Sequence, residues 1–335
     1  MMRYILISFM TLAVLGCQKT PTSTSNLKIG FILDNMNEER YAKDRAYFEE
    51  KAKSLGAEVI FASANSDVST QMNKVENMMV SGVKAIVIQP VDSNASASMV
   101  KAAKAQNIAI IAYDRIIQNA PIDLYVTQDS FKVGVLQAEA AVKATSAKGN
   151  YVILSGAEGH SVAEAITSGV RSVLSKYPEI KIVTHQYHQG WSSDLALKTV
   201  ENTLTKTKND VAAILANNSG MARGAVQAVA EQKLSGKIFI AGADADLSSV
   251  RDITKDRQQF EVLKDIKPLA EAAAIAAVKL AKGEVVEFDT TMDNGSGVPV
   301  KVINTMVYPV NKENLEQVII QSGFHSQKDV YGSTN

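Results

Sequence analysis

Apolar and polar positions along the chain group into short apolar segments separated by longer amphipathic ones. Several short segments are apolar without alternation, which is typical of strands buried on both faces of a parallel sheet. Asp67 can cap the second amphipathic segment, and Gly56 follows the first, where a left-handed residue is favoured. The first part of the chain is predicted to form strands at 28–33, 58–62, 84–88, 108–113 and 124–127, with helices at 43–55, 69–81 and 94–106.

The same alternation of strand and helix begins again near residue 150. Because about 300 residues are large for one hydrophobic core, we predict an α/β protein with two lobes, each built on a doubly wound, Rossmann-like sheet. In this second part, strands are predicted at 150–154, 180–187, 211–216, 237–241 and 260–264, helices near 162–176, 193–206 and 220–233, and then a helix at 268–282 and strands near 285–290 and 302–308.

The N-terminal segment has the features of an export signal. Arg3 precedes an apolar run that is too short to span a bilayer as a helix. The run ends in VLGC at 14–17, which resembles the lipobox of bacterial lipoproteins, and Cys17 is the only cysteine of the chain. We therefore predict a lipoprotein signal peptide over 1–17, a lipid on Cys17 and a flexible tether at 18–26. A free cysteine behind an ordinary signal peptide is the alternative.

The charge balance narrows the range of partners. Lysine plus arginine number 35, as do aspartate plus glutamate, so no basic excess attracts nucleic acid or an anionic membrane. No second apolar run of about 18 residues appears, so no transmembrane helix is predicted. The protein is expected in the cell envelope, facing the periplasm or on the outer surface of the cytoplasmic membrane.

Polar residues gather where the predicted strands end. In open parallel sheets, ligands bind beyond the carboxyl ends of the strands. The first lobe presents a polar loop at 34–41 and the pair Asp114-Arg115. The second lobe presents polar groups after its own strands, at 158–161, 190–191, 217–219, 244–246 and Lys264. Both lobes are thus predicted to direct polar side chains at one cleft.

The mixture of side chains in these loops suits a neutral ligand. A sugar hydroxyl both donates and accepts hydrogen bonds, so its site needs carboxylates and amides beside Arg and Lys, whereas an anionic ligand calls for an excess of cations. Tyr41 and Trp191 can pack against the apolar face of a sugar ring. Taken singly, each residue is equally well explained as a helix cap, an ion pair or core. The residues alone therefore indicate an α/β binding protein.

Seven stretches together carry a resemblance to a known family. They are 39–45, 63–65, 70–72, 112–115, 244–247, 293–295 and 323–325. On these stretches the chain resembles the xylose-binding proteins of bacterial ABC importers, within the type I periplasmic-binding-protein family, from about Lys28 to His325. The resemblance implies two lobes joined by a three-segment hinge. It assigns 27–129 plus 265–292 to the N-terminal lobe and 130–264 plus 293–333 to the C-terminal lobe.

The resemblance also implies a set of sugar-binding residues. Trp191 falls on the ring that stacks against the sugar, and Tyr41 stands where a facing Trp is usual. At His160 and Ser161 the family usually has Asp and Asn, and Ser219 stands where an Asp is expected, so the sugar is left open between xylose and a close aldose. His160 could add a pH dependence. The positions that fall on the family's hydrogen-bonding residues are Arg40, Asp114, Arg115, Asn218, Asp244 and Lys264.

The family mechanism implied is hinge closure on a monosaccharide, followed by delivery to an ABC permease. A sugar-sensing role with a membrane histidine kinase or chemoreceptor is the alternative partner assignment. A monomer without cofactor or metal is expected, and no nucleic acid partner. The strongest enzyme alternative is a nucleophile elbow at 159–163, with His185, His188 or His325 as base, but its fifth residue is Ala163 and its serine lies well past the strand end. We therefore predict that the protein is not an enzyme.

Overall fold

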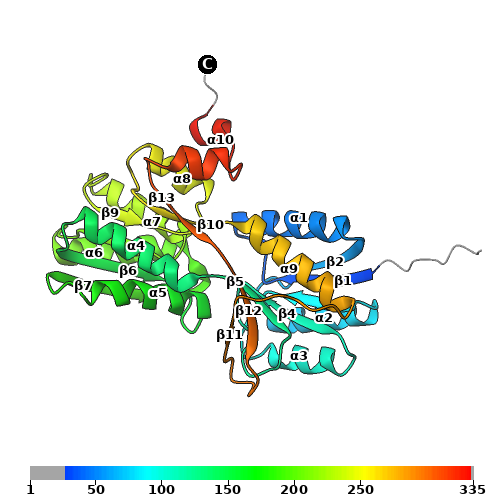
Figure 1. Cartoon of the computed structure of the whole chain (residues 1–335). Coiled ribbons are helices and arrows are strands. Elements are labelled where there is room, and N and C mark those ends of the chain that lie inside the picture. The colour runs from blue at the N-terminus through cyan, green and yellow to red at the C-terminus, as the bar shows by residue number, and fades with distance from the viewer. Residues whose placement is uncertain (1–26, 333–335) are drawn as a thin grey trace, which may run out of the picture.

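The computed structural model describes residues 27–332, which fold into two α/β lobes (Figure 1). The predicted signal peptide, Cys17 and the tether at 18–26 lie outside the described residues. Across residues 27–332, every helix is too short or too polar to cross a membrane.

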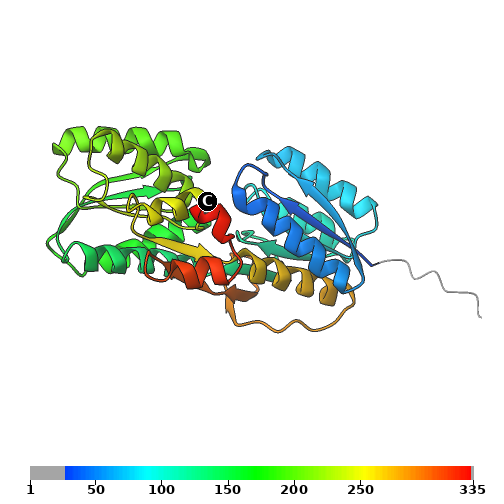
Figure 2. The same cartoon turned by 90° about the horizontal axis from the view of Figure 1, so that it is seen from above.

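The N-terminal lobe is a seven-stranded sheet in the order β11-β12-β5-β4-β3-β1-β2. Helices α1 and α9 cover one face of this sheet, and α2 and α3 cover the other (Figures 1 and 2). All strands are parallel except β11, which pairs antiparallel with β12. The bounds are β1 Leu27–Leu33, β2 Ala57–Ser63, β3 Ala85–Ile88, β4 Ala109–Tyr113, β5 Leu124–Gln128, β11 Thr290–Met292, β12 Val300–Thr305, α1 Glu39–Ser54, α2 Val68–Val80, α3 Ala97–Lys104 and α9 Ile266–Ala281.

The C-terminal lobe has a parallel sheet in the order β7-β6-β8-β9. A bridge from Ala241 to Phe260 places β10 beside β9, and β13 pairs antiparallel with β10. Helices α4 and α5 pack on one face and α6 and α7 on the other. The bounds are β6 Gly149–Ser155, β7 Ile180–Tyr187, β8 Ala213–Ala216, β9 Phe239–Ala241, β10 Glu261–Lys264, β13 Val307–Val310, α4 Ser130–Ala144, α5 Ser161–Leu174, η1 Gln189–Trp191, α6 Ser193–Thr207, α7 Ser219–Glu231, α8 Leu247–Thr254, η2 Glu316–Gln321 and α10 Gln327–Tyr331.

The two lobes repeat one topology. The order β2-β1-β3-β4-β5 of the first lobe matches β7-β6-β8-β9-β10 of the second, and both are doubly wound. The predicted fold class is confirmed. In such sheets the strand order reverses at the first strand, and a crevice opens there beyond the carboxyl ends. The topology therefore places the ends of β1, β4, β6, β8 and β9 around the space between the lobes.

The last strands differ from the prediction. The strand expected near 285–290 lies at 290–292, and the apolar stretch 302–308 is two strands, β12 and β13. Because β12 pairs with β5, residues 293–305 extend the first sheet, and the boundary predicted at 292 moves to Met306. The chain therefore crosses between lobes at 128–130, 264–266 and 305–307.

Three α-helices of the described residues, α4, α8 and α10, are not among the predicted ones, and neither are the short helices η1 and η2. In α4, small residues such as Gly134 and Ala138 form the buried side, so the contrast between apolar and polar positions is weak. Gly134 faces α5 so closely that an added Cβ would lie 1.9 Å from the Ile166 carbonyl oxygen. A glycine that normally weakens a helix is thus required here by helix packing.

Candidate functional site

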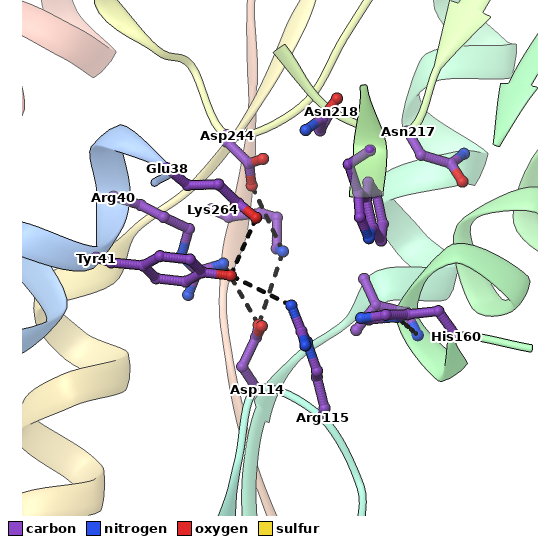
Figure 3. A pocket seen from close by; sticks show the side chains of 12 residues that line it. Glu38, Arg40, Tyr41, Asp114, Arg115, His160, Asn217, Asn218, Asp244 and Lys264 are labelled. Carbon is purple, nitrogen blue, oxygen red and sulfur yellow. Dashed lines mark hydrogen bonds and ion pairs between the residues drawn. The ribbon is translucent and has the colours of Figure 1, made fainter. Parts of the chain in front are cut away.

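A polar pocket lies between the lobes (Figure 3). It is lined by all the predicted ligand-binding residues except Ser161, and also by Glu38, Val162 and Asn217. Glu38 and Asn217 stand in the polar strand-end loops seen in the sequence, next to residues of the predicted set.

On the N-terminal side, Arg115 is held by three groups. Its Nη1 lies 2.7 Å from an oxygen of Asp34 and 3.3 Å from the carbonyl oxygen of Pro90, and its Nη2 donates to the Tyr41 hydroxyl at 3.2 Å. The Tyr41 hydroxyl in turn donates to Glu38 at 3.1 Å. Burial alone would lower the pKa of Arg115, but these neighbours raise it above its usual range. The guanidinium is therefore a fixed cation in the pocket wall.

Asp114 is surrounded by cations. One carboxylate oxygen lies 3.4 Å from Nη1 of Arg40 and 3.8 Å from Nζ of Lys264, and the other accepts from the amide of Gln89 at 3.1 Å. Burial would raise the pKa of Asp114, but Arg40, Lys264 and Arg115 together hold it well below its usual range. Asp114 is thus an ionised acceptor at the floor of the pocket.

Arg40 is braced from behind by a buried carboxylate. Its Nε and Nη2 contact the two oxygens of Asp44 at 3.1 and 3.3 Å, in the forked arrangement that fixes a guanidinium plane. Tyr113 also donates to Asp44. Asp44 was not visible as a site residue in the sequence, although its spacing of four from Arg40 on a helix is the signal that pairs them.

Lys264 links the two sides. It ends β10 at the hinge, and its Nζ lies 3.8 Å from Asp114 of the first lobe and 3.5 Å from Asp244 of the second. Figure 3 shows Lys264 between these two carboxylates. A single ammonium therefore balances one acid from each lobe.

On the C-terminal side, His160 caps helix α5. Its Nδ1 accepts from the backbone N–H of Val162 at 3.2 Å, so a neutral imidazole must carry its proton on Nε2. Burial and the nearby Arg115 lower the pKa of His160 to about 3. No residue within 27–332 partners the buried Nε2. His160 is thus a neutral donor at the pocket, and it does not titrate near neutral pH.

Trp191 is placed by a tight turn. It has a positive φ of 56° at the end of η1, and its ring meets the His160 ring edge to face at 5.1 Å. An added Cβ on Gly156 would lie 2.5 Å from the Trp191 ring, so only glycine allows the ring to sit at this distance. The strand end thus provides a flat apolar surface in the pocket.

The two asparagines after β8 bond to the backbone with one end of each amide. Asn218 caps α7 by accepting from the N–H of Met221 at 2.9 Å, and Asn217 accepts from the N–H of Gly156 at 3.0 Å. In the part of the chain that the structure describes, the Nδ2 of Asn217 is buried without a partner. These bonds leave amide N–H groups as donors on this side.

Ser161 does not line this pocket. It lines a second, more open hollow near the hinge, together with Thr127 and Asn304. Its Oγ is buried and has no hydrogen-bond partner among the described residues. In particular, no histidine of this part of the chain bonds to it. The geometry therefore supports neither a ligand contact for Ser161 nor the nucleophile-elbow alternative. The same part of the chain contains no group of three His, Cys, Asp or Glu that could hold a metal ion.

Comparisons with known proteins agree with this architecture. A family model described as "Periplasmic binding protein domain" matches residues 29–285. The D-xylose-binding periplasmic protein of Escherichia coli is 40% identical over 91% of this chain and 92% of its own length. The protein of that name from Haemophilus influenzae is 38% identical over 92% and 93%.

Solved structures give the same picture. A carbohydrate transporter solute binding protein from Chloroflexus aurantiacus, in complex with D-glucose, superposes with a TM-score of 0.83 at 29% identity, covering 90% of this chain and 98% of its own. A periplasmic solute binding protein of an ABC transporter from Actinobacillus succinogenes, with bound D-allose, has a TM-score of 0.77 at 27% identity, covering 86% and 98%.

Proposed function

The chain belongs to the periplasmic binding protein family, and we propose that it captures a monosaccharide, xylose or a close aldose, in the pocket between its lobes. The relatives at 40% and 38% identity are named for D-xylose, and similar structures hold D-glucose and D-allose. Binding without covalent chemistry accounts for the whole site.

The observation that carries this proposal is the composition of the pocket wall. Carboxylates of Asp114 and Asp244 can accept, while Arg115, Lys264 and the His160 Nε2–H can donate. Hydroxyl groups of a polyol satisfy both kinds at once. The ring of Trp191 adds the apolar surface that the C–H face of a pyranose needs.

His160 bears on which sugar fits. An Asp at this position would only accept a hydrogen bond, whereas the neutral imidazole offers a donor through Nε2. The sugar hydroxyl that meets His160 must therefore accept a hydrogen bond from it. Because a hydroxyl can either donate or accept, the same sugar can still bind if this hydroxyl donates its own proton to another acceptor.

Closure of the lobes is the proposed mechanism. Contacts already bridge the cleft mouth: the N–H of Leu247 donates to Glu39 at 3.3 Å, and Nζ of Lys43 donates to the carbonyl oxygen of Phe324 at 3.1 Å. A sugar that bonds to both walls favours the closed form, because its affinity differs between open and closed states. We propose that an ABC permease recognises this form; a membrane histidine kinase or chemoreceptor is the alternative receiver.

We also propose that Cys17 anchors the protein to a membrane. The motif VLGC at 14–17 and the absence of any other cysteine support lipid attachment. Labelled palmitate should enter the full chain and not its Cys17→Ser variant. The protein without residues 1–17 is expected to be a monomer, and light scattering after gel filtration can measure its mass.

The test is a titration of protein lacking residues 1–17 with xylose, glucose, ribose, arabinose and galactose. Trp191 is the only tryptophan and lines the pocket, so its fluorescence reports on this site alone. Calorimetry should give one-to-one saturable binding, tightest for xylose. If no sugar changes either signal, the proposal is wrong.

A further inference from the structure

A buried carboxyl group stands behind the pocket without lining it. Glu261, at the start of β10, is 0% exposed and is not among the residues that face the cavity. Sequence patterns gave it no role, since it belongs to an apolar strand. A buried acid is costly unless it is bonded on all sides, so its partners indicate what it holds in place.

The partners of Glu261 come from three segments. Its Oε2 lies 3.0 Å from the hydroxyl of Ser219 and accepts from the N–H of Ala245 at 3.1 Å. Its Oε1 accepts from the amide of Gln258 at 2.6 Å. The hydroxyl of Ser219 also accepts from the N–H of Asp246 at 3.1 Å. One carboxyl group therefore holds both amides that follow Asp244, one directly and one through Ser219.

The segment that Glu261 holds has an unfavourable backbone. Asp244 and Ala245 have φ angles of 93° and 54°, in the region that side chains other than glycine avoid. Such residues persist only where surrounding bonds fix them. This backbone directs the carboxylate of Asp244 at Lys264, 3.5 Å away in the pocket. Two other bonds hold the ends of this loop: the N–H of Asp244 donates to the carbonyl oxygen of Val262 at 2.9 Å, and Nε2 of His325 lies 2.8 Å from the carbonyl oxygen of Ala245. The amides of Ala245 and Asp246 depend on Glu261 and Ser219.

We propose that Glu261 is a positioning residue for ligand binding, which fixes the loop 244–246 so that Asp244 faces the sugar. The effect on affinity rests on the proposed function, but the effect on the loop does not. Ser219, which stands where the resemblance expects an Asp, helps Glu261 to hold this loop by accepting from the N–H of Asp246.

Proton counting indicates that Glu261 works in its neutral form. The hydroxyl of Ser219 has one proton but lies near two acceptors, the carbonyl oxygen of Ala243 at 2.8 Å and Oε2 of Glu261. A protonated Glu261 supplies the second proton, and both contacts are then satisfied. Burial, together with the carboxylates Asp246 and Asp244 that face it, raises the pKa of Glu261 to about 8, although the hydrogen bonds from Gln258 and Ala245 lower it. Both observations give a neutral acid at pH 7.

The experiment compares Glu261→Gln with Glu261→Met. An amide at 261 can accept from the N–H of Ala245 with its oxygen, and the hydroxyl of Ser219 can then donate to that oxygen in place of the carbonyl oxygen of Ala243. Its nitrogen faces Gln258, whose Oε1 has no partner within the described residues and can turn to accept, at the cost of the bond from Gln258 to the carbonyl oxygen of Phe260. The thioether of Met offers no comparable acceptor. E261Q should bind sugar within a few fold of the wild type, whereas E261M should bind roughly ten- to hundredfold more weakly.

A second readout needs no sugar. Hydrogen exchange at the amides of Ala245 and Asp246 should accelerate at least tenfold in E261M and stay near the wild-type rate in E261Q. Thr203→Val removes a buried hydroxyl of α6 in the same lobe, far from this loop, and serves as the control for a general loss of stability. Between pH 7 and 9.5 the wild type should lose affinity several fold relative to E261Q, because only the wild type ionises at 261.

The outcomes separate the two proposals. Wild-type protein that binds no sugar would refute the function, while exchange at Ala245 would still decide the role of Glu261. Unchanged exchange and affinity in E261M would overturn the positioning role, as would equal losses in E261M and T203V. If E261M does not fold, Ser219→Ala takes its place. It must then accelerate exchange at Asp246, and a wild-type rate there would refute the relay.

Discussion

The two lobes share one topology, but the side chains with which they line the pocket are held in place in different ways. On the N-terminal side, charged groups are bonded to each other, as Arg115 is to Asp34 and Arg40 is to Asp44. On the C-terminal side, His160 and Asn218 bond to the first turn of their own helices and turn the remaining atom to the pocket. The first wall is a charge network whose members depend on each other, whereas the hydrogen bonds of His160 and Asn218 do not depend on one another. Substitutions in the charge network should affect folding and binding, and those of His160 and Asn218 binding alone.

The largest effect is expected from Arg115→Met. The change removes a donor from the pocket and leaves Asp34 buried without its cation, which costs about 3–5 kcal/mol of unfolding free energy. Sugar affinity should fall by a factor of roughly a thousand, since a charged donor is lost and its neighbours lose their orientation. Urea unfolding and calorimetry measure the two losses, with the exposed Arg45→Met on α1 as control.

Adding Asp34→Asn to Arg115→Met tests whether the unpaired charge of Asp34 causes the loss of stability. An amide carries no charge, so the double variant should recover most of the unfolding free energy and none of the affinity. If the double variant stays as unstable as R115M, the network is not what stabilises this wall.

A smaller effect is expected from His160→Asn on the other wall. Asparagine caps helices well, so the start of α5 should be preserved, but its short amide does not reach where Nε2 lies. Affinity should fall about tenfold, with unfolding free energy within about 1 kcal/mol of the wild type. A loss of several kcal/mol in H160N would remove the contrast between the two walls.

The pH dependence of stability distinguishes His160 from Glu261. The pKa of His160 is lowered from 6.5 to about 3, so its contribution is complete above pH 6.5 and is lost as the pH falls towards 3. The pKa of Glu261 is raised from 4.5 to about 8, so its contribution is complete below pH 4.5 and is lost as the pH rises through 8. Each slope is at most about 1.4 kcal/mol per pH unit for one group.

Urea unfolding from pH 4 to 9 measures these slopes. Relative to the wild type, E261Q should become more stable as the pH rises, and H160N more stable as it falls. Sugar affinity should show no titration of His160 between pH 5 and 8, contrary to the pH dependence that its residue type suggested. A binding transition near pH 6.5 that disappears in H160N would show that the imidazole is more hydrated than its burial indicates.

Much of the site could be predicted because one rule of doubly wound sheets links sequence to space. Polar residues after apolar strands meet at the cleft, so Asp114, Trp191 and Asp244 were predictable without any contact information. Glu261 was not, because its bonds join β10 to segments 16 and 42 residues away and leave no local pattern. The third crossover, which the resemblance placed after residue 292, lies at 305–307 because β12 pairs with β5 of the first sheet. The stretch 302–308 gave no local sign of it, since Met306 between the two strands is no turn residue.

The smallest effect is expected from Ser161→Ala, beside His160. His160 is the extended N-cap and Ser161 the first helical residue of α5, and His160 lines the pocket while Ser161 lines the hinge hollow. S161A should therefore keep the sugar affinity within about twofold and the unfolding free energy within about 0.5 kcal/mol. H160N, measured alongside, is the positive control. If S161A weakens binding as much as H160N does, sugar binding must rotate the start of α5 towards the cleft, and the C-terminal wall would then be built by closure.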